Sequence, residues 1–288
     1  MPTVIPLEQR KKRFLEMYRV FRALCEKHDI PFFATGGTAI GVLRHQGFVP
    51  WDDDFDVVML PQDYERFHLI AAEELKGTHY RLLDCADDRD YPRQYPFFAD
   101  MNTYRQPHAR TPIKKKEYLT LGIDIFVYYN VPDDAQTLRP YLRTAWILNH
   151  LYYISVSPLI KVPLTNKALR LMSQAIIYVL YGIMKLLPVL RHALVRRWVR
   201  FRNRYHNKTS HYAQLLLTKR NNKSYTRKEL LPAVWLPFED VEVPVMKNYE
   251  QFLTDVFGDY MQLPPEEQRV GHPSYIIEFL DEPTSEIG

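Results

Sequence analysis

A glycine turn followed by a run of acids, between Phe33 and Met59, constrains this 288-residue chain more than any other feature. Residues 31–34 form a short apolar segment that breaks at Gly36-Gly37-Thr38, and apolar residues at helical spacing follow, which predicts strand, tight turn and helix. Glycines let backbone N–H groups approach an anion closely, and a helix N-terminus adds about half a positive charge there. Gly36, Gly37 and Thr38 are therefore candidate phosphate-binding residues, although a plain turn remains an alternative.

The acid run leads into a predicted strand over residues 54–60, bounded by Pro61. Strand side chains alternate in direction, so Asp54 and Asp56 should share one face while Phe55 and Val57 point toward the core. Two carboxylates about 5 Å apart repel by on the order of 3 kcal/mol at an effective dielectric of about 20. A divalent cation would relieve this repulsion, and carboxylate oxygens favour Mg²⁺ or Mn²⁺.

The next predicted strand, residues 122–127, carries a third acid, Asp124, between two isoleucines. An unpaired carboxylate in an apolar strand is costly to bury. We predict that Asp124 completes a metal site with Asp54 and Asp56. The alternative is a core aspartate paired with a basic residue, since buried acids are usually paired.

The same residues carry a resemblance to a known family. The chain resembles the LicD proteins, which belong to the nucleotidyltransferase-fold superfamily together with the fukutin-related transferases. The motifs that carry the resemblance are the segment Thr38–Asp56, Ile123–Phe126 with Val131–Asp134, and Phe257–Met261 with Pro264-Pro265 and Arg269. They lie at both ends of the chain, and the middle carries no motif of the family.

The resemblance implies an α/β (α+β) nucleotidyltransferase-fold core with a mixed sheet. It also implies a phosphotransferase that moves a phospho-alcohol, typically phosphocholine from CDP-choline, onto a sugar of a cell-surface glycan or its lipid-linked precursor. In the superfamily's pattern the glycine turn (Gly36–Thr38) holds phosphates and the Asp-x-Asp pair (Asp54 and Asp56) binds the metals. The third acid, Asp124, completes the site and helps to deprotonate the acceptor hydroxyl.

The sequence indicates further candidate substrate-binding residues. Arg44, Trp51 and Asp53 lie inside the matching motif, and Arg269 could reach phosphate. Arg105 belongs to a basic segment, residues 91–117, that we expect to be irregular and to act as a lid over phosphates or as a plain surface loop. A choline cation would need an aromatic box, for which Trp51, Tyr95 and Tyr104 are candidates.

Charge is distributed unevenly along the chain, whose formal net charge is +4. Residues 135–228 contain no acid but 18 of the 38 lysines and arginines. Two charge-free runs in this stretch, 144–160 and 171–184, are shorter than the roughly 20 apolar residues that span a bilayer, so we expect no spanning helix. A basic amphipathic helix from residue 190 could lie on an anionic membrane, or pack inward with a basic rim. An anionic acceptor could also explain the charge, whereas no nucleic-acid-binding motif is present.

The remaining organisation follows from periodicity and composition. We expect a catalytic core in residues 1–134, a largely helical basic insertion in 135–228, and a C-terminal part, 229–288, that completes the core, with 281–288 flexible. Local patterns further predict helices over 7–28, 64–75 and 249–257, strands over 80–83 and 238–244, and an acidic loop over 84–90.

The chain opens without the apolar stretch of a signal peptide, so we expect a cytoplasmic enzyme that contacts the inner face of the membrane peripherally. The two cysteines, Cys25 and Cys85, suggest neither a disulfide framework nor a zinc site. Two other functions stay open at this point. One is a metal-dependent glycosyltransferase that uses Asp-x-Asp to hold a nucleotide sugar, and the other is a non-catalytic membrane-attached adaptor.

Overall fold

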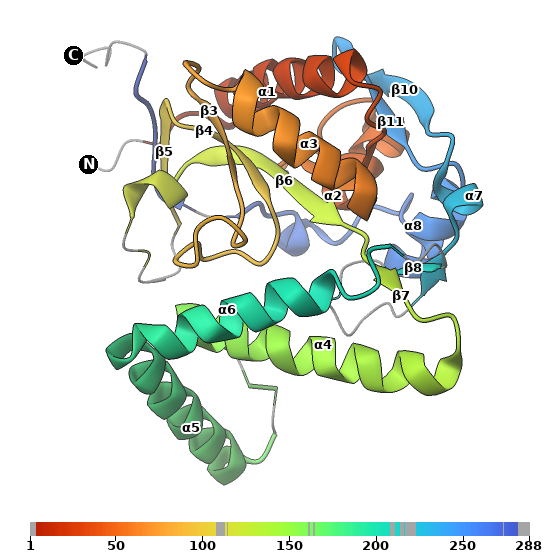
Figure 1. Cartoon of the computed structure of the whole chain (residues 1–288). Helices are drawn as coiled ribbons and strands as arrows, with labels where there is room; N and C mark the ends of the chain where they lie inside the picture. Colours follow the sequence, from red (N-terminus) through yellow and green to blue (C-terminus); the bar gives the residue numbers. More distant parts are fainter. Residues whose placement is uncertain are drawn as a thin grey trace, which may run out of the picture.

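The computed structural model describes residues 4–107, 113, 115–160, 162–163, 165–207, 211–213, 216, 223–272 and 274–281. Its centre is a mixed sheet that confirms the predicted α/β class (Figure 1). The seven strands lie in the order β10 (Val234–Phe238), β11 (Val241–Val245), β1 (Phe33–Ala34), β2 (Asp56–Met59), β6 (Leu121–Val127), β4 (Phe97–Asp100) and β3 (Tyr80–Leu83).

The central strands set the geometry of the site. Strand β2 is antiparallel to β1 and parallel to β6, and their register places Asp56 directly opposite Asp124. Neighbouring strands lie about 4.8 Å apart, so the two acids that were predicted to converge stand side by side. Two smaller sheets join β12 (Ser274–Phe279) to β5 (Thr103–Pro107), and β7 (Asn130–Val131) to β8 (His211–Ala213) and β9 (Ser224–Tyr225).

Helices cover the sheet and form a separate layer beside it (Figure 1). The predicted helices over 7–28, 64–75 and 249–257 are confirmed as α1, α3 and α8. The helices are α1 (Leu7–Lys27), α2 (Gly36–Ile40), α3 (Pro61–Glu74), α4 (Ala135–Val156), α5 (Lys167–Leu186), α6 (Pro188–Arg202), α7 (Arg227–Leu230) and α8 (Tyr249–Phe257), with 3₁₀ turns at Lys116–Tyr118 and Glu266–Gln268. Figure 1 shows α1 and α3 over one face of the sheet, while α4 and α6 lie beside each other below it.

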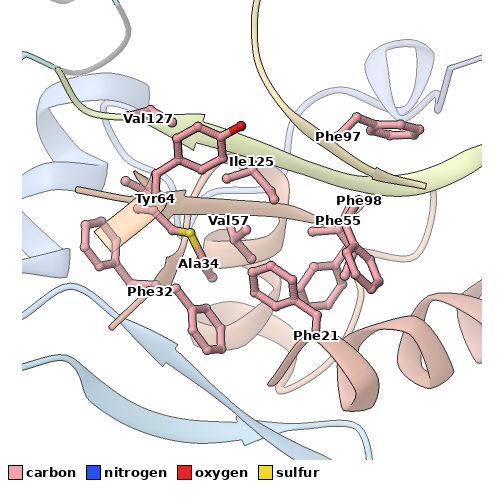
Figure 2. Packing of buried hydrophobic residues seen from close by; sticks show 14 of the residues in the cluster. Phe21, Phe32, Ala34, Phe55, Val57, Tyr64, Phe97, Phe98, Ile125 and Val127 are labelled. Carbon is pink, nitrogen blue, oxygen red and sulfur yellow. The ribbon is translucent and has the colours of Figure 1, made fainter. Parts of the chain in front are cut away.

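The core between α1, α3 and the sheet is largely aromatic (Figure 2). Phe21 of α1 packs against Phe98 and Phe67, with ring centres 5.6 and 5.1 Å apart. Phe55 and Val57 are fully buried, as the alternation of the acid-run strand predicted. Each such side chain contributes about 1.5–3 kcal/mol when it is removed from water. Buried aromatic and aliphatic side chains therefore hold the strand that carries Asp56 rigidly in place.

Two local predictions were wrong. Residues 91–117 are not irregular throughout, because they contain β4 and β5. The strand predicted over 238–244 is a hairpin, since Glu239 takes a left-handed conformation (φ 50°) and reverses the chain between β10 and β11. The loop predicted over 84–90 is present, although Asp84 within it is buried and pairs with Arg202 at 2.8 Å. The other part of the predicted lid, residues 108–112 and 114, lies outside the described residues.

The basic region is largely helical, as predicted, and its α6 packs inward. Trp198 and Val195 are buried, so the stripe expected to face a membrane faces the protein in the second half of this helix. Arg202 at its end ties α6 to the core through Asp84. The alternative of an inward-packing helix with a basic rim therefore holds for α6. The boundaries at residues 134 and 228 stay a prediction.

Candidate active site

The glycine turn is required because two carboxylates pack against it. Gly36 has φ +57°, and a Cβ there would lie 2.6 Å from Asp56 Oδ2. A Cβ on Gly37 would lie 2.0 Å from Asp52 Oδ2. Real Cβ atoms do not approach oxygen this closely, so any larger residue would displace an acid. The predicted strand, turn and helix are confirmed as β1 and α2, and α2 continues into wider π-type turns over Gly41–His45.

Thr38 fastens this turn to β2. Its hydroxyl oxygen accepts a hydrogen bond from the Asp56 N–H at 2.8 Å, and the Thr35 N–H donates to the Asp56 carbonyl at 3.1 Å. The side chain of Thr38 is buried. Its predicted contact with phosphate stays a prediction, whereas its contact with the backbone of Asp56 is present in the structure. The turn and the acid strand thus form one unit.

The three predicted metal ligands lie at two neighbouring central strands and shift one another's pKa values. Asp54 precedes β2, Asp56 begins β2, and Asp124 lies in β6. These three acids are called the carboxylate cluster below. Burial, reinforced by Asp52, raises the pKa of Asp54 to about 7. Burial raises the pKa of Asp56 well above its usual value, and the charges of Asp54 and Asp124 raise it further. Burial likewise raises the pKa of Asp124 to about 6, against the opposing effect of Arg93. Such a cluster of oxygen ligands fits a divalent cation such as Mg²⁺ or Mn²⁺.

Arg93 also contacts this cluster, and sequence reasoning missed it. Its guanidinium lies 2.7 Å from Asp124 Oδ1 and 3.7 Å from the ring centre of Phe97. The Tyr95 hydroxyl lies 3.5 Å from Asp124 Oδ2. Both interpretations of Asp124 therefore hold in part, because it is paired with an arginine and also stands beside the other two acids. Arg93 precedes β4 in a segment rich in basic residues, where no spacing singles it out.

Among the described residues, the one group of potential ligands whose atoms all lie within 4.8 Å of one another is Asp52, Asp54 and His272. Of the three predicted metal ligands this group contains Asp54 alone. His272 Nδ1 lies 3.1 Å from Asp53 and 3.3 Å from Asp54, and its hydrogen bond to Asp53 raises the pKa of His272 to about 8. Asp53 is buried and Asp52 is partly buried, so neither is a fully solvated turn residue.

Asp53 anchors three distant segments at the site. Arg10 of α1 and Arg105 of β5 each lie 3.2 Å from its Oδ2, and the His272 N–H donates to its Oδ1 at 2.8 Å. Arg105 Nε also donates to the Ser274 hydroxyl at 3.0 Å. Arg105 therefore belongs to an ordered strand rather than to a loose lid. The substrate contacts predicted for Asp53 and Arg105 stay predictions beside these structural contacts.

Arg44, Trp51 and Arg269 join the helix after the turn to the C-terminal loop. Arg44 donates to the Tyr260 carbonyl at 2.7 Å, and Arg269 Nε donates to the Pro264 carbonyl at 2.9 Å. The Arg269 guanidinium lies 5.6 Å from the Trp51 ring centre. Burial lowers the pKa of Arg44, and the charge of Arg269 lowers it further. The substrate-binding roles predicted for these three residues stay predictions.

The aromatic candidates for a choline box are distributed. Trp51 contacts Arg269, Tyr95 lies beside Asp124, and the exposed Tyr104 hydroxyl donates to Gln106 on β5. Of the three, Tyr95 lies at the carboxylate cluster. The two cysteines are buried and free.

Comparison with known proteins agrees with this geometry. Residues 29–169 match the family model described as LicD/FKTN/FKRP, nucleotidyltransferase domain, a range that contains the glycine turn and all three predicted metal ligands. The chain thus has the nucleotidyltransferase domain of this class, and it belongs to the LicD family.

Two relatives illustrate the extent of the similarity. The chain is 29% identical over 271 residues to the lipopolysaccharide cholinephosphotransferase LicD of Haemophilus influenzae, covering 93% of this chain and 96% of that protein. A shorter match, 32% identical over 75 residues, covers 25% of this chain and 24% of an uncharacterised protein of Rickettsia typhi.

Proposed function

We propose that the chain is a transferase that moves a phospho-alcohol, phosphocholine in the first instance, from a CDP-activated donor onto a sugar hydroxyl. The acceptor is a cell-surface glycan or its lipid-linked precursor. The observation that carries the proposal is the juxtaposition of Asp54, Asp56 and Asp124 beside the glycine turn. The name of the Haemophilus influenzae relative supports the phosphocholine group and the glycan acceptor.

The residues of the carboxylate cluster fit a divalent metal. Asp54, Asp56 and Asp124 would hold Mg²⁺ or Mn²⁺, because three carboxylates with raised pKa values need positive charge to ionise together. When bound, the ion supplies neutralisation of the phosphate charge. Arg93 supplies only one positive charge to this cluster, which leaves the acids in excess.

The protein's own groups position the reactants. The N–H groups of the glycine turn would bind the diphosphate of the donor. Asp124, which is oriented by Arg93, would accept the proton of the acceptor hydroxyl. The hydroxyl oxygen bonds to the phosphorus that carries the alcohol, and the bond from that phosphorus to CMP breaks. Phosphoryl transfer depends mainly on positioning and charge neutralisation, which the rigid sheet provides.

The location that fits this activity is the cytoplasmic side of a membrane, where nucleotide-activated donors meet lipid-linked acceptors. The basic region would suit an anionic acceptor, because residues 135–228 contain no acid.

A donor panel tests the proposal. The purified chain would be incubated with Mg²⁺, a lipopolysaccharide acceptor and, separately, CDP-choline, CDP-glycerol, CDP-ribitol and UDP-sugars. We expect CMP release and labelled acceptor with CDP-choline. Turnover of a UDP-sugar alone would replace the proposal with a glycosyltransferase, and turnover of no donor would favour the non-catalytic adaptor.

A further inference from the structure

Helix α5 exposes an unusual amount of apolar surface. It projects away from the sheet on the far side of α4 and α6 (Figure 1). Leu171 is 71% exposed and Leu186 is 82% exposed. Residues 171–184 carry no charge. Contiguous apolar surface of this kind on a water-soluble domain usually marks an interaction site.

Six of the exposed apolar residues lie on one side of the helix. They recur alternately three and four residues apart, which aligns them along one face of a helix with 3.6 residues per turn. The residues that form this apolar face are Leu169, Met172, Ile176, Val179, Ile183 and Leu186, and each of them is exposed.

A different side of α5 faces the protein. Its buried and half-buried residues are Ser173, Gln174, Ile177, Leu180, Tyr181 and Met184, whereas Lys167, Arg170 and Lys185 are exposed. Gln174 Nε2 donates to the Pro158 carbonyl at 2.7 Å. The apolar face is therefore surface that the fold leaves exposed in addition to the side of α5 that packs against the protein.

Charge selects the partner for this surface. The three cations Lys167, Arg170 and Lys185 flank the apolar face at both ends, and no acid occurs anywhere in residues 135–228. An apolar face with a basic rim matches the acyl chains and headgroups of an anionic lipid bilayer. We propose that α5 binds such a bilayer by lying in its plane, with the apolar face in the acyl region.

The same residues decide between lying in the bilayer and crossing it. Among the described residues, α5 is the one helix long and apolar enough to cross a membrane by length and composition. Its charge-free part, residues 171–184, is however about 21 Å long at 1.5 Å per residue, against about 30 Å of hydrocarbon. Crossing would also separate α4 from α6, which contact each other on the same side of α5. Lying in the plane instead keeps the cations at both ends in the headgroup layer.

Vesicle co-sedimentation tests the proposal without reference to enzyme activity. The full chain is expected to bind phosphatidylglycerol-containing vesicles more tightly than phosphatidylcholine vesicles. The double variant Ile176→Asp/Val179→Asp should weaken binding at least tenfold. Leu69→Asp is the matched control, because Leu69 on α3 is 65% exposed and lies outside the apolar face, so it should change nothing. Equal loss in the control, or no binding by the unmodified chain, would overturn the proposal.

Depth measurements test the orientation. Cys25 and Cys85 are buried, so a single surface cysteine can be labelled selectively. Fluorophores attached to Leu169→Cys, Ile176→Cys and Ile183→Cys should be quenched equally by lipids with a spin label at one acyl depth. A steady gradient along the helix would contradict the in-plane orientation. If light scattering instead showed a dimer that Ile176→Asp dissociates, the apolar face would be an interface between two copies of the chain, and the lipid proposal would be wrong.

Discussion

The carboxylate cluster and helix α5 each break the usual rule that charged groups are exposed and apolar groups are buried, but in opposite ways. In the carboxylate cluster, Asp54, Asp56 and Asp124 are partly buried, and burial raises their pKa values. On α5, apolar side chains are exposed although a core could have held them. Each arrangement is unfavourable in the isolated chain and would become favourable with the partner proposed above, a cation in one case and a lipid surface in the other. Exceptions to local folding rules tend to mark functional places.

The largest effect on activity should follow from removing a charge from the carboxylate cluster. Asp56→Asn should reduce phosphocholine transfer at least about 10³-fold, because the residue lies between the glycine turn and Asp124. The melting temperature should not fall, because the amide relieves repulsion among the acids. Asp240→Asn on the exposed hairpin turn should leave transfer unchanged. Full activity of Asp56→Asn would remove this residue from the site.

The ion pair that joins α6 to the loop after β3 gives the next largest effect. Arg202→Met removes the guanidinium whose Nη2 donates to both carboxylate oxygens of the buried Asp84, and it should destabilise the fold by about 3–5 kcal/mol. Urea unfolding would measure the change. The double variant Asp84→Leu/Arg202→Met should be less destabilised than Arg202→Met alone. Equal loss in both would show that the arginine acts through packing rather than through its charge.

A methyl group at the turn should have a smaller effect. Gly37→Ala would place a Cβ 2.0 Å from Asp52 Oδ2, and the resulting shift should lower both stability, by about 1–3 kcal/mol, and transfer. Gly182→Ala is the matched control on α5, where a Cβ meets nothing within 4 Å and should stabilise the helix by roughly 0.5–1 kcal/mol. Unchanged activity in Gly37→Ala would show that the turn tolerates displacement of Asp52.

The pH dependence of stability should sharpen the comparison further. In the folded protein Asp54 keeps its proton up to a pKa of about 7 and Asp124 up to about 6, whereas in the unfolded chain both ionise near a pKa of about 4. The folded state therefore binds more protons between pH 4 and 7, so raising the pH through this range lowers the free energy of unfolding. Mg²⁺ should offset this loss, so its increase of the melting temperature should be larger at pH 8 than at pH 5. An increase independent of pH would place the ion elsewhere.

Local sequence patterns were sufficient for the centre of the site. The strand, turn and helix around Gly36 follow from spacing over a few residues, and the alternation of Asp54, Phe55 and Asp56 fixes which side chains face the core. The placement of Asp124 beside Asp56 needed one further inference, that two apolar strands would be neighbours. These features depend on short-range periodicity, which the sequence displays directly.

Contacts between distant segments could not be predicted in this way. His272 lies far along the chain from Asp53, and Arg93 meets Asp124 only because β4 pairs with β6. The reversal at Glu239 depends on a left-handed residue that alternation does not reveal. The membrane prediction was attached to the helix from residue 190, because its arginines stand out. The structure buries Trp198 of that helix and exposes α5 instead.

The most direct test of the central claim is a titration with Mn²⁺ followed by electron paramagnetic resonance. The unmodified chain should bind Mn²⁺, and CDP should tighten that binding because, as proposed, the glycine turn would hold its diphosphate beside the carboxylates. The triple variant Asp54→Asn/Asp56→Asn/Asp124→Asn should lose the bound signal while keeping a cooperative unfolding transition. Equal Mn²⁺ affinity in both proteins would contradict the assignment of these three acids as a metal site.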